Sequence, residues 1–284
     1  MNKVCVVLGP TATGKTEYGV KLAQKLGGEI VSADSMLVYR GMDIGTAKPS
    51  AQEMMGIPHH MIDIVAPDEE FNVAVYQKDA KRIISDILAR GCVPILVGGT
   101  GLYINSITHN LDFSVANSNN ALRDELNLID TATLHQMLAR EDPAAAKRIH
   151  PNNKKRVVRA LIIAREGGSS EYNFNNVNKD YNFEFYGLCC ERTALYERIN
   201  KRVDKMMEKS LVSEVEQLFV KYGGTSTAMQ GIGYKEIINY IVGRSTLNEA
   251  VEEIKKNTRH LAKRQITWFK RDERINWFDI GDLR

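Results

Sequence analysis

The sequence predicts an α/β fold in which a parallel sheet is flanked by helices. Apolar runs of strand length occur at residues 4–8, 29–32, 93–97 and 183–190, and helical patterns separate them. Strands that alternate with helices are typical of a parallel sheet. A glycine-rich phosphate-binding motif follows the first run directly, which places it at the carboxyl edge of that sheet. We therefore expect a fold like that of the P-loop NTPases.

Composition is that of an ordinary globular protein. The 284 residues are 43% hydrophobic, enough for one large core and a small additional subdomain. No apolar run approaches about 18 residues, and residues 1–3 lead directly into the first strand, so we expect a cytoplasmic protein without a signal peptide or membrane span. The four cysteines form no C-x-x-C pair. We expect buried thiols rather than disulfides or a zinc site.

Residues 9–16 match the phosphate-binding pattern G-x-x-x-x-G-K-[ST] at every fixed position. The motif consists of Gly9, Pro10, Thr11, Ala12, Thr13, Gly14, Lys15 and Thr16. Backbone N–H groups and the N-terminus of the helix that begins near residue 17 would surround an anion, Lys15 would add a charge, and Thr16 could ligate Mg²⁺. The alternative is a glycine turn that only joins strand to helix. The motif does not say which phosphate bond breaks.

The second strand is followed by Asp34, which places a carboxylate at the same edge of the sheet. Three roles are open for Asp34: a turn cap, an outer-sphere Mg²⁺ ligand, or a base that takes a proton from an acceptor.

The third strand runs into a glycine turn at residues 98–101 that contains Thr100. Many ATPases end this strand with an aspartate, whereas here a single hydroxyl is available to a phosphate or a bridging oxygen. A packing turn is the alternative. The adjacent His59 and His60 do not face the same way, so we expect hydrogen bonding from them rather than a metal site.

Leucines at helical spacing and no strand-like run mark residues 117–150 as a small all-helical insertion. Residues 1–116 and 151–284 would then form the catalytic core. Residues 167–182 have the composition of a loop. From residue 193 the chain is predicted to be helical, up to a last short strand at 275–278.

Basic residues gather in two stretches, although the formal net charge is only +3. The first spans residues 147–159, and the second, residues 255–274, carries eight Lys or Arg against two acids. Such patches suit phosphate backbones, but solvated helix faces have the same composition. Arg198 and Arg202 share a helix face, where they could reach an anion or pair with Glu197 or Glu208.

Taken together, six motifs of the chain resemble those of the tRNA dimethylallyltransferases, in that family's order and over nearly the whole chain. They are residues 9–16, 34–41 (DSMLVYRG), 44–49 (IGTAKP), 57–60 (IPHH), 98–103 (GGTGLY) and 262–269 (AKRQITWF). The resemblance implies transfer of a dimethylallyl group from dimethylallyl diphosphate to N6 of the adenosine just 3′ of the anticodon (position 37). The tRNAs concerned read codons that start with U, and diphosphate is released.

The resemblance also implies roles for residues. Residues 9–16 would hold the donor diphosphate, with Thr16 on Mg²⁺, and the partners would be tRNA and dimethylallyl diphosphate, bound by a monomer. The implied catalytic residues are Asp34 as the base, Thr100 at the bridging oxygen, and Lys15 and Arg202 on the diphosphate. The implied tRNA-binding residues are Asp34, Ser35, Met36, Leu37, Thr100, Arg123, Lys155, Arg156, Val157, Val158 and Arg159, with Lys263 and Arg264 as further candidates.

Three positions depart from the family pattern. Leu37 stands where Gln is usual, Ile162 where Glu is usual, and Ser210 where Gly is usual. A hydrogen bond to the target adenine or its neighbour can therefore be missing or replaced at Leu37.

Other functions share parts of this pattern. A small-molecule kinase with ATP in the loop would use the same sheet and Asp34, and a prenyltransferase acting on free adenine nucleotides would need nearly the same residues. The helical insertion and the basic C-terminal helices count against the latter. A tRNA-binding module with a vestigial loop would be expected to lack Lys15, Thr16, Asp34 or Thr100, and all four are present.

Overall fold

The computed structural model describes residues 2–113, 120–168 and 174–282. The chain forms two compact units: unit 1 comprises Met1–Thr108 and Lys179–Arg284, and unit 2 comprises His109–Asn178.

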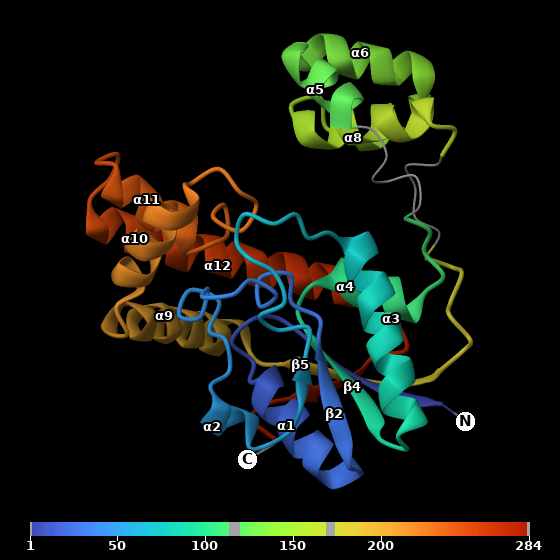
Figure 1. Ribbon diagram of the computed structural model, residues 1–284, viewed down its shortest axis with the longest axis vertical. Coiled ribbons are helices and arrows are strands. Elements are labelled where there is room, and N and C mark those ends of the chain that lie inside the picture. Colours follow the sequence, from blue (N-terminus) through green and yellow to red (C-terminus); the bar gives the residue numbers. More distant parts are fainter. Residues whose placement is uncertain (1, 114–119, 169–173, 283–284) are drawn as a thin grey trace. The chain divides into compact units, whose positions relative to one another are not determined.

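Unit 1 is built on a six-stranded sheet with the strand order β3-β2-β4-β1-β5-β6, in which all pairs are parallel. Figure 1 labels β2, β4 and β5 of this sheet. The strands are β1 (Lys3–Leu8), β2 (Gly28–Ser32), β3 (His59–His60), β4 (Val93–Gly98), β5 (Asn182–Cys189) and β6 (Asn276–Asp279). The four long predicted strands and the short last one are confirmed. β3 was not predicted, because two residues are too few to show a periodic pattern.

Helices cover both faces of the sheet. Alternate residues of β1 point to opposite faces, as the two-residue period of a strand requires. Val4 and Val6 pack with α3 (Val73–Ala89) and α4 (Gly101–Thr108), whereas Cys5 and Val7 pack with α1 (Lys15–Leu26). The strands are thus buried on both sides, which explains their continuous apolar character.

Two glycines allow the loops at the carboxyl edge of the sheet to lie very close to neighbouring strands. A Cβ atom at Gly9, which follows β1, would lie 2.3 Å from the carbonyl oxygen of Leu188 on β5. At Gly98, the last residue of β4, it would lie 2.2 Å from the carbonyl oxygen of Ala33, which follows β2. The loops that follow β1, β2 and β4 therefore meet at one edge.

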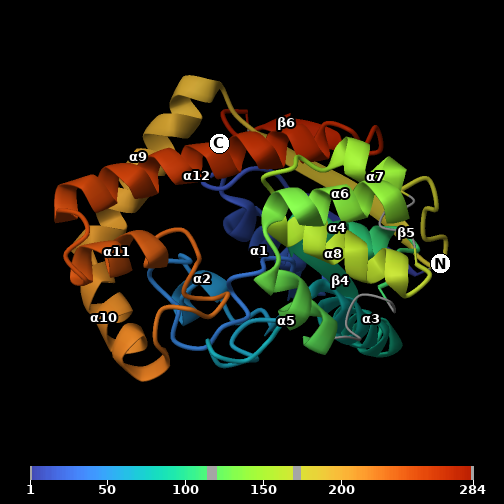
Figure 2. The same ribbon diagram turned by 90° about the horizontal axis from the view of Figure 1, so that it is seen from above.

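A second core of unit 1 lies beside the sheet, among α9 (Arg192–Glu208), α10 (Leu211–Tyr222), α11 (Tyr234–Ile241) and α12 (Leu247–Phe269) (Figure 2). Buried residues of these helices, such as Leu211 and Ile254, pack around Val38, Tyr39 and Met42. Those three belong to the long connection that runs from β2 to the short helix α2 (Ala51–Met54). The helical C-terminal part was expected, and its core holds this connection against the helices.

Unit 2 is helical, as expected, but larger than the predicted insertion. It contains α5 (Asn120–Leu128), α6 (Thr131–Glu141), α7 (Pro143–Arg148) and also α8 (Lys154–Arg165). Val157 and Leu161 of α8 share a buried cluster with Leu134 and Leu138 of α6. The apolar pattern of α8 predicts a helix but not its partner, so the sequence placed residues 151–165 in the catalytic core. Residues 117–119 of the predicted insertion and 169–173 of the predicted loop lie outside the described residues.

None of the helices in the described ranges is both long and apolar enough to cross a membrane.

A buried carboxylate ties the edge strand β3 to the sheet. Glu29 of β2 accepts a hydrogen bond from Nη2 of Arg90 at 2.9 Å, contacts the second guanidinium nitrogen, and bonds to Nε2 of His60 at 2.7 Å. Only 7% of its side chain is exposed. Hydrogen bonds from Arg90, with a further contribution from His60, hold the pKa of Glu29 below its ordinary value.

Glu29→Gln should lower the free energy of unfolding by about 1–3 kcal/mol at pH 7, because the amide keeps only one acceptor oxygen for Arg90 and His60 and turns its NH₂ group toward one of these donors. Glu17→Gln, which removes an exposed pair with Lys21, serves as the control and should cost less than about 0.5 kcal/mol. Because the folded-state pKa of Glu29 is lowered, its contribution is present above the ordinary pKa and is lost as the pH falls through the lowered one. Urea unfolding at pH 7 and pH 3 checks this, and an equal loss at both values would contradict it.

Candidate active site

In the phosphate-binding loop between β1 and α1, two side chains of the loop donate hydrogen bonds to one of its own carbonyl oxygens. Lys15 Nζ donates to the Pro10 carbonyl at 2.7 Å, and the Thr13 hydroxyl donates to the same oxygen at 2.8 Å. Gly14 caps α1 with a φ of 80°, a value that favours glycine. The strand, loop and helix N-terminus thus follow in the order that an anion site requires.

Two arginines of α9 reach toward this edge of the sheet. Arg198 Nε donates to the carbonyl of Ala12 in the loop at 2.7 Å. One turn further on, Arg202 Nη2 donates to the carbonyl of Thr46 at 3.1 Å. Both arginines thus donate to backbone carbonyl oxygens, and the anion-binding role of this helix face stays a prediction.

Charges from three separate elements are coupled here. Burial, followed by the nearby guanidinium of Arg202, lowers the pKa of Lys15 to about 7, while the carboxylate of Asp34 acts in the opposite direction. Burial also lowers the pKa of Arg202, and Asp34 and Glu53 oppose that shift. Two cations and the carboxylate of Asp34 therefore influence one another, and the two cations would be stabilised by an added anion.

Asp34 and Thr100 lie on loops that are tied together. Thr100 Oγ1 accepts a hydrogen bond from the backbone N–H of Ser35 at 3.0 Å and donates to the Ser35 hydroxyl at 3.3 Å. The carboxylate oxygen Oδ1 of Asp34 accepts from the N–H of Met36 at 2.9 Å. Asp34 therefore caps its turn through one oxygen, which leaves its second carboxylate oxygen for another partner.

Gln265 of α12 connects the two glycine loops, and the sequence did not single it out. Its Oε1 accepts from the N–H of Thr11 at 2.8 Å, and its Nε2 donates to the carbonyl of Gly99 at 3.0 Å. One helical turn later, Trp268 packs over Gly101, where a Cβ atom would lie 2.4 Å from Trp268 Cδ1. In the sequence, Gln265 is visible only as one position of the motif at residues 262–269. That motif does not reveal the contacts of Gln265 with Thr11 and Gly99, which are far away in sequence.

The histidine pair makes hydrogen bonds, as predicted. His59 Nδ1 lies 2.8 Å from the carbonyl oxygen of Ile57, and His60 bonds to Glu29. Within residues 2–113, 120–168 and 174–282, no cluster of three or more His, Cys, Asp or Glu side chains is suited to hold a metal ion. The four cysteines are free, and only Cys5 is buried, so the expectation of buried thiols is wrong for the other three.

The predicted tRNA-binding residues divide between the two units. Asp34, Ser35, Met36, Leu37 and Thr100 belong to unit 1. The remainder, Arg123, Lys155, Arg156, Val157, Val158 and Arg159, belong to unit 2.

Within unit 2, burial separates these residues into two groups. Lys155 and Arg156 are exposed, and Arg123 and Arg159 are half-buried. Val157 and Val158 are 0% and 4% exposed and pack in the core of unit 2, which corrects the expectation that they contact RNA.

The chain matches the family model of the IPP transferases over residues 37–272. It is 50% identical to a tRNA dimethylallyltransferase of Pelotomaculum thermopropionicum over 98% of this chain and 91% of that protein. It is 52% identical to a tRNA dimethylallyltransferase of Desulforudis audaxviator over 98% of this chain and 92% of that protein.

Solved structures of enzymes with related names are also similar to this chain. The full-length tRNA isopentenylpyrophosphate transferase of Bacillus halodurans superposes with a TM-score of 0.76 at 45% identity, over 99% of this chain and 90% of that one. A eukaryotic dimethylallyltransferase acting on tRNA superposes with a TM-score of 0.84 at 31% identity, over 99% of this chain and 74% of that one.

The bridge formed by Gln265 can be tested with a double-mutant cycle. Gln265→Ala should lower the free energy of unfolding by about 1–2 kcal/mol, because it removes both hydrogen bonds. Gly99→Ala should be destabilising as well, since its Cβ atom would lie 2.3 Å from Gln265 Nε2 and displace the amide. In the Gln265→Ala background, Gly99→Ala should cost much less. Urea unfolding of the four proteins measures this, and an equal cost in both backgrounds would contradict the bridge.

Proposed function

The chain belongs to the IPP transferase family, and we propose that it transfers the dimethylallyl group of dimethylallyl diphosphate to N6 of an adenosine in tRNA. The acceptor would be the adenosine just 3′ of the anticodon (position 37), in tRNAs that read codons starting with U. The observation that carries the proposal is that the loop holding Lys15 and the carboxylate of Asp34, whose loop is tied to Thr100, both follow strands at the carboxyl edge of the sheet. The protein would act in the cytoplasm as a monomer.

The donor half of the site is residues 9–16 together with Arg202. Backbone N–H groups of the loop and the N-terminus of α1 would surround the diphosphate, and Lys15 would exchange its bond to the Pro10 carbonyl for a phosphate oxygen. Lys15 and Arg202 would stabilise the charge that develops as the bond between the allylic carbon and the bridging oxygen breaks. Diphosphate would be the leaving group.

The acceptor half is Asp34 with its tied neighbour Thr100. The N6 amine would attack the allylic carbon as diphosphate departs, and its proton would pass to the Asp34 carboxylate. Thr100, held by Ser35, would contact the bridging oxygen. Because the amine becomes strongly acidic only as the new bond forms, catalysis would depend mainly on positioning and charge stabilisation.

The donor set of the loop fits Mg²⁺. Mg²⁺ is usually bound by one or two protein groups, substrate phosphates and water rather than by a protein cage, and Thr16 offers one hydroxyl beside the diphosphate site. Bound with the diphosphate, Mg²⁺ would neutralise part of its charge.

Exposed basic residues would bind the tRNA phosphates. Lys155 and Arg156 on α8, with the half-buried Arg123 and Arg159, give unit 2 the charge for such contacts, and Lys263 and Arg264 are exposed on α12. Asp34, Ser35, Met36 and Leu37 would line the path of the target base. Because a stacked base cannot reach a site at the edge of a sheet, the adenosine would be flipped out of the anticodon loop.

The proposed function is tested by incubating the protein with labelled dimethylallyl diphosphate, Mg²⁺ and tRNA from a strain that lacks this modification. Label should appear in tRNA at the adenosine 3′ of the anticodon, and AMP or ADP should not compete as acceptors. ATP in place of the prenyl donor should yield no ADP. Label in AMP instead of tRNA would identify a nucleotide prenyltransferase, and ADP formation would identify a kinase; either result overturns the proposal.

Asp34 can be tested with two variants that separate its cap from its charge. Asp34→Asn keeps an oxygen for the Met36 N–H, whereas Asp34→Ala removes both cap and charge. If Asp34 is the base, both should lower kcat by about 10²- to 10⁴-fold, the range typical of a general base. Donor affinity should not weaken, since the lost charge is negative. Single-turnover rates measure turnover, and titration with the donor measures its affinity. Near-normal turnover of Asp34→Asn would show that Asp34 only caps its turn and is not the base.

A further inference from the structure

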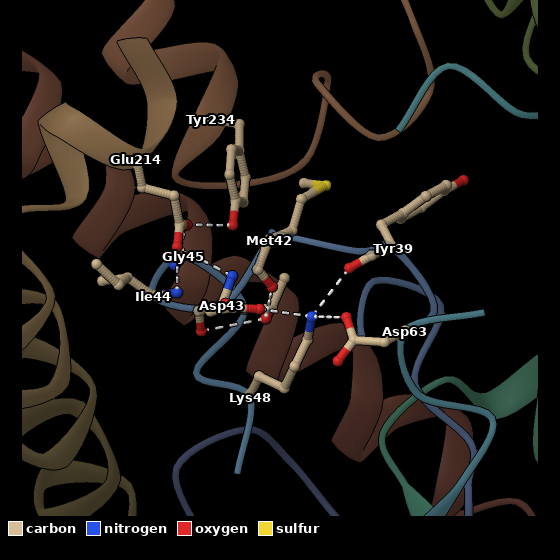
Figure 3. A network of polar contacts seen from close by, with 10 residues as sticks. Tyr39, Met42, Asp43, Ile44, Gly45, Lys48, Asp63, Glu214 and Tyr234 are labelled. Carbon is tan, nitrogen blue, oxygen red and sulfur yellow. Dashed lines mark hydrogen bonds and ion pairs between the residues drawn. The ribbon is translucent and has the colours of Figure 1, made fainter. Parts of the chain in front are cut away.

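A carboxylate on α10 gathers three consecutive backbone N–H groups of the connection after β2. Glu214 Oε2 accepts from Asp43 at 3.0 Å and from Ile44 at 2.7 Å, and Oε1 accepts from Gly45 at 3.1 Å. The hydroxyl of Tyr234 on α11 donates to Oε1 at 2.7 Å. Figure 3 shows the carboxylate between this loop and the tyrosine.

The chemistry of this arrangement requires an ionised carboxylate. Successive backbone N–H groups directed to one side form a concave anion site, and here a side chain of the same protein occupies it. A carboxylate offers two oxygens and accepts all four hydrogen bonds. A glutamine side chain has one acceptor oxygen, and its NH₂ group would face donors. The loop at 43–45 is therefore held by charge as well as by shape.

Lys48 fixes the same connection further along. Its Nζ donates to the Tyr39 carbonyl at 2.9 Å and to Asp43 Oδ1 at 2.6 Å, and it contacts Asp63 (Figure 3). Only 6% of the Lys48 side chain is exposed. The two ends of the segment 43–48 are thus anchored, one by Glu214 and the other by Lys48.

Thr46 lies between these anchors and contacts the candidate active site. Its hydroxyl donates to the Met42 carbonyl at 2.6 Å, and its own carbonyl accepts from Arg202 Nη2 at 3.1 Å. A guanidinium is planar and carries five N–H donors, so a fixed acceptor on one nitrogen sets the direction of the others. The position of the Thr46 carbonyl therefore restricts the directions in which the remaining donors of Arg202 can point.

We propose that Glu214 is a positioning residue for the donor half of the site, which acts through the segment 43–46 and the Thr46 carbonyl to orient Arg202 toward the diphosphate. This inference rests on the proposed function, because it takes Arg202 to be a ligand of the donor diphosphate. Glu214 itself touches neither substrate. Its effect on donor binding must then pass through Arg202.

The test is a double-mutant cycle read out as donor affinity. Glu214→Gln, Arg202→Ala and the double variant are titrated with dimethylallyl diphosphate and Mg²⁺ in the absence of tRNA, and kcat and KM are measured with tRNA. Glu214→Gln should raise the Kd of the donor by about 10-fold, with a matching rise in donor KM. Arg202→Ala should raise it further, and adding Glu214→Gln to Arg202→Ala should have no further effect.

Glu216→Gln is the matched control, because Glu216 is exposed on the same helix. It should leave donor Kd and KM unchanged. Tyr234→Phe provides a milder change that keeps the ring and removes one hydrogen bond to Glu214. It should raise donor Kd by about 2- to 5-fold, again only when Arg202 is present, and it keeps the test usable if Glu214→Gln does not fold.

The possible failures are distinct. If Arg202→Ala leaves donor affinity unchanged, the assigned role of Arg202 fails and the inference falls with it. If Arg202→Ala weakens donor binding but Glu214→Gln and Tyr234→Phe do not, the inference alone is overturned. Effects of Glu214→Gln that persist in full in the Arg202→Ala background would also overturn it, because they would show a general loss of structure rather than positioning of Arg202.

Discussion

The candidate active site depends on the close approach of backbone segments at the carboxyl edge of the parallel sheet. β1 pairs with both β4 and β5, so the loop after β1 must pass the ends of its neighbours. It can do so because Gly9 has no side chain: a Cβ atom there would lie 2.3 Å from the Leu188 carbonyl oxygen. Gly98 likewise has no Cβ atom to collide with the carbonyl oxygen of Ala33. A side chain at Gly98 would separate the loops that carry Asp34 and Thr100, and one at Gly9 would push the loop that carries Lys15 away from β5.

This closeness has an electrostatic cost that explains which ligand the site suits. Lys15 and Arg202 are like charges in a partly desolvated place, and both have a lowered pKa there. Asp34 offsets only part of this repulsion. A diphosphate supplies several negative oxygens at once, and more charge develops on it as it leaves. Two constrained cations at one place therefore favour the binding of an anion over that of a neutral ligand.

Local pattern was sufficient to predict every strand except the two-residue β3, and also the strand, loop and helix around residues 9–16, because each of these is contiguous in sequence. It failed where the partner is remote. Gln265 and Thr11 are 254 positions apart, and Glu214 and Ile44 are 170 apart, so no window of sequence contains both members of either pair. The placement of α8 failed for a related reason: an apolar helix face indicates burial, but two separate cores were available to bury it.

Leu37, which stands where the family usually has Gln, changes the hydrogen-bonding capacity of the loop after β2 rather than its backbone contacts. The backbone carbonyl of Leu37 accepts a hydrogen bond from the N–H of Asp63 at 3.1 Å, and the next residue, Val38, is fully buried. Neither interaction involves the Leu37 side chain, so both are open equally to Gln and to Leu at this position. What changes is that a leucine can only pack against a base, whereas a glutamine can donate and accept hydrogen bonds. Along the path that we propose for the base, recognition would then rely more on shape and on neighbouring polar groups such as Ser35.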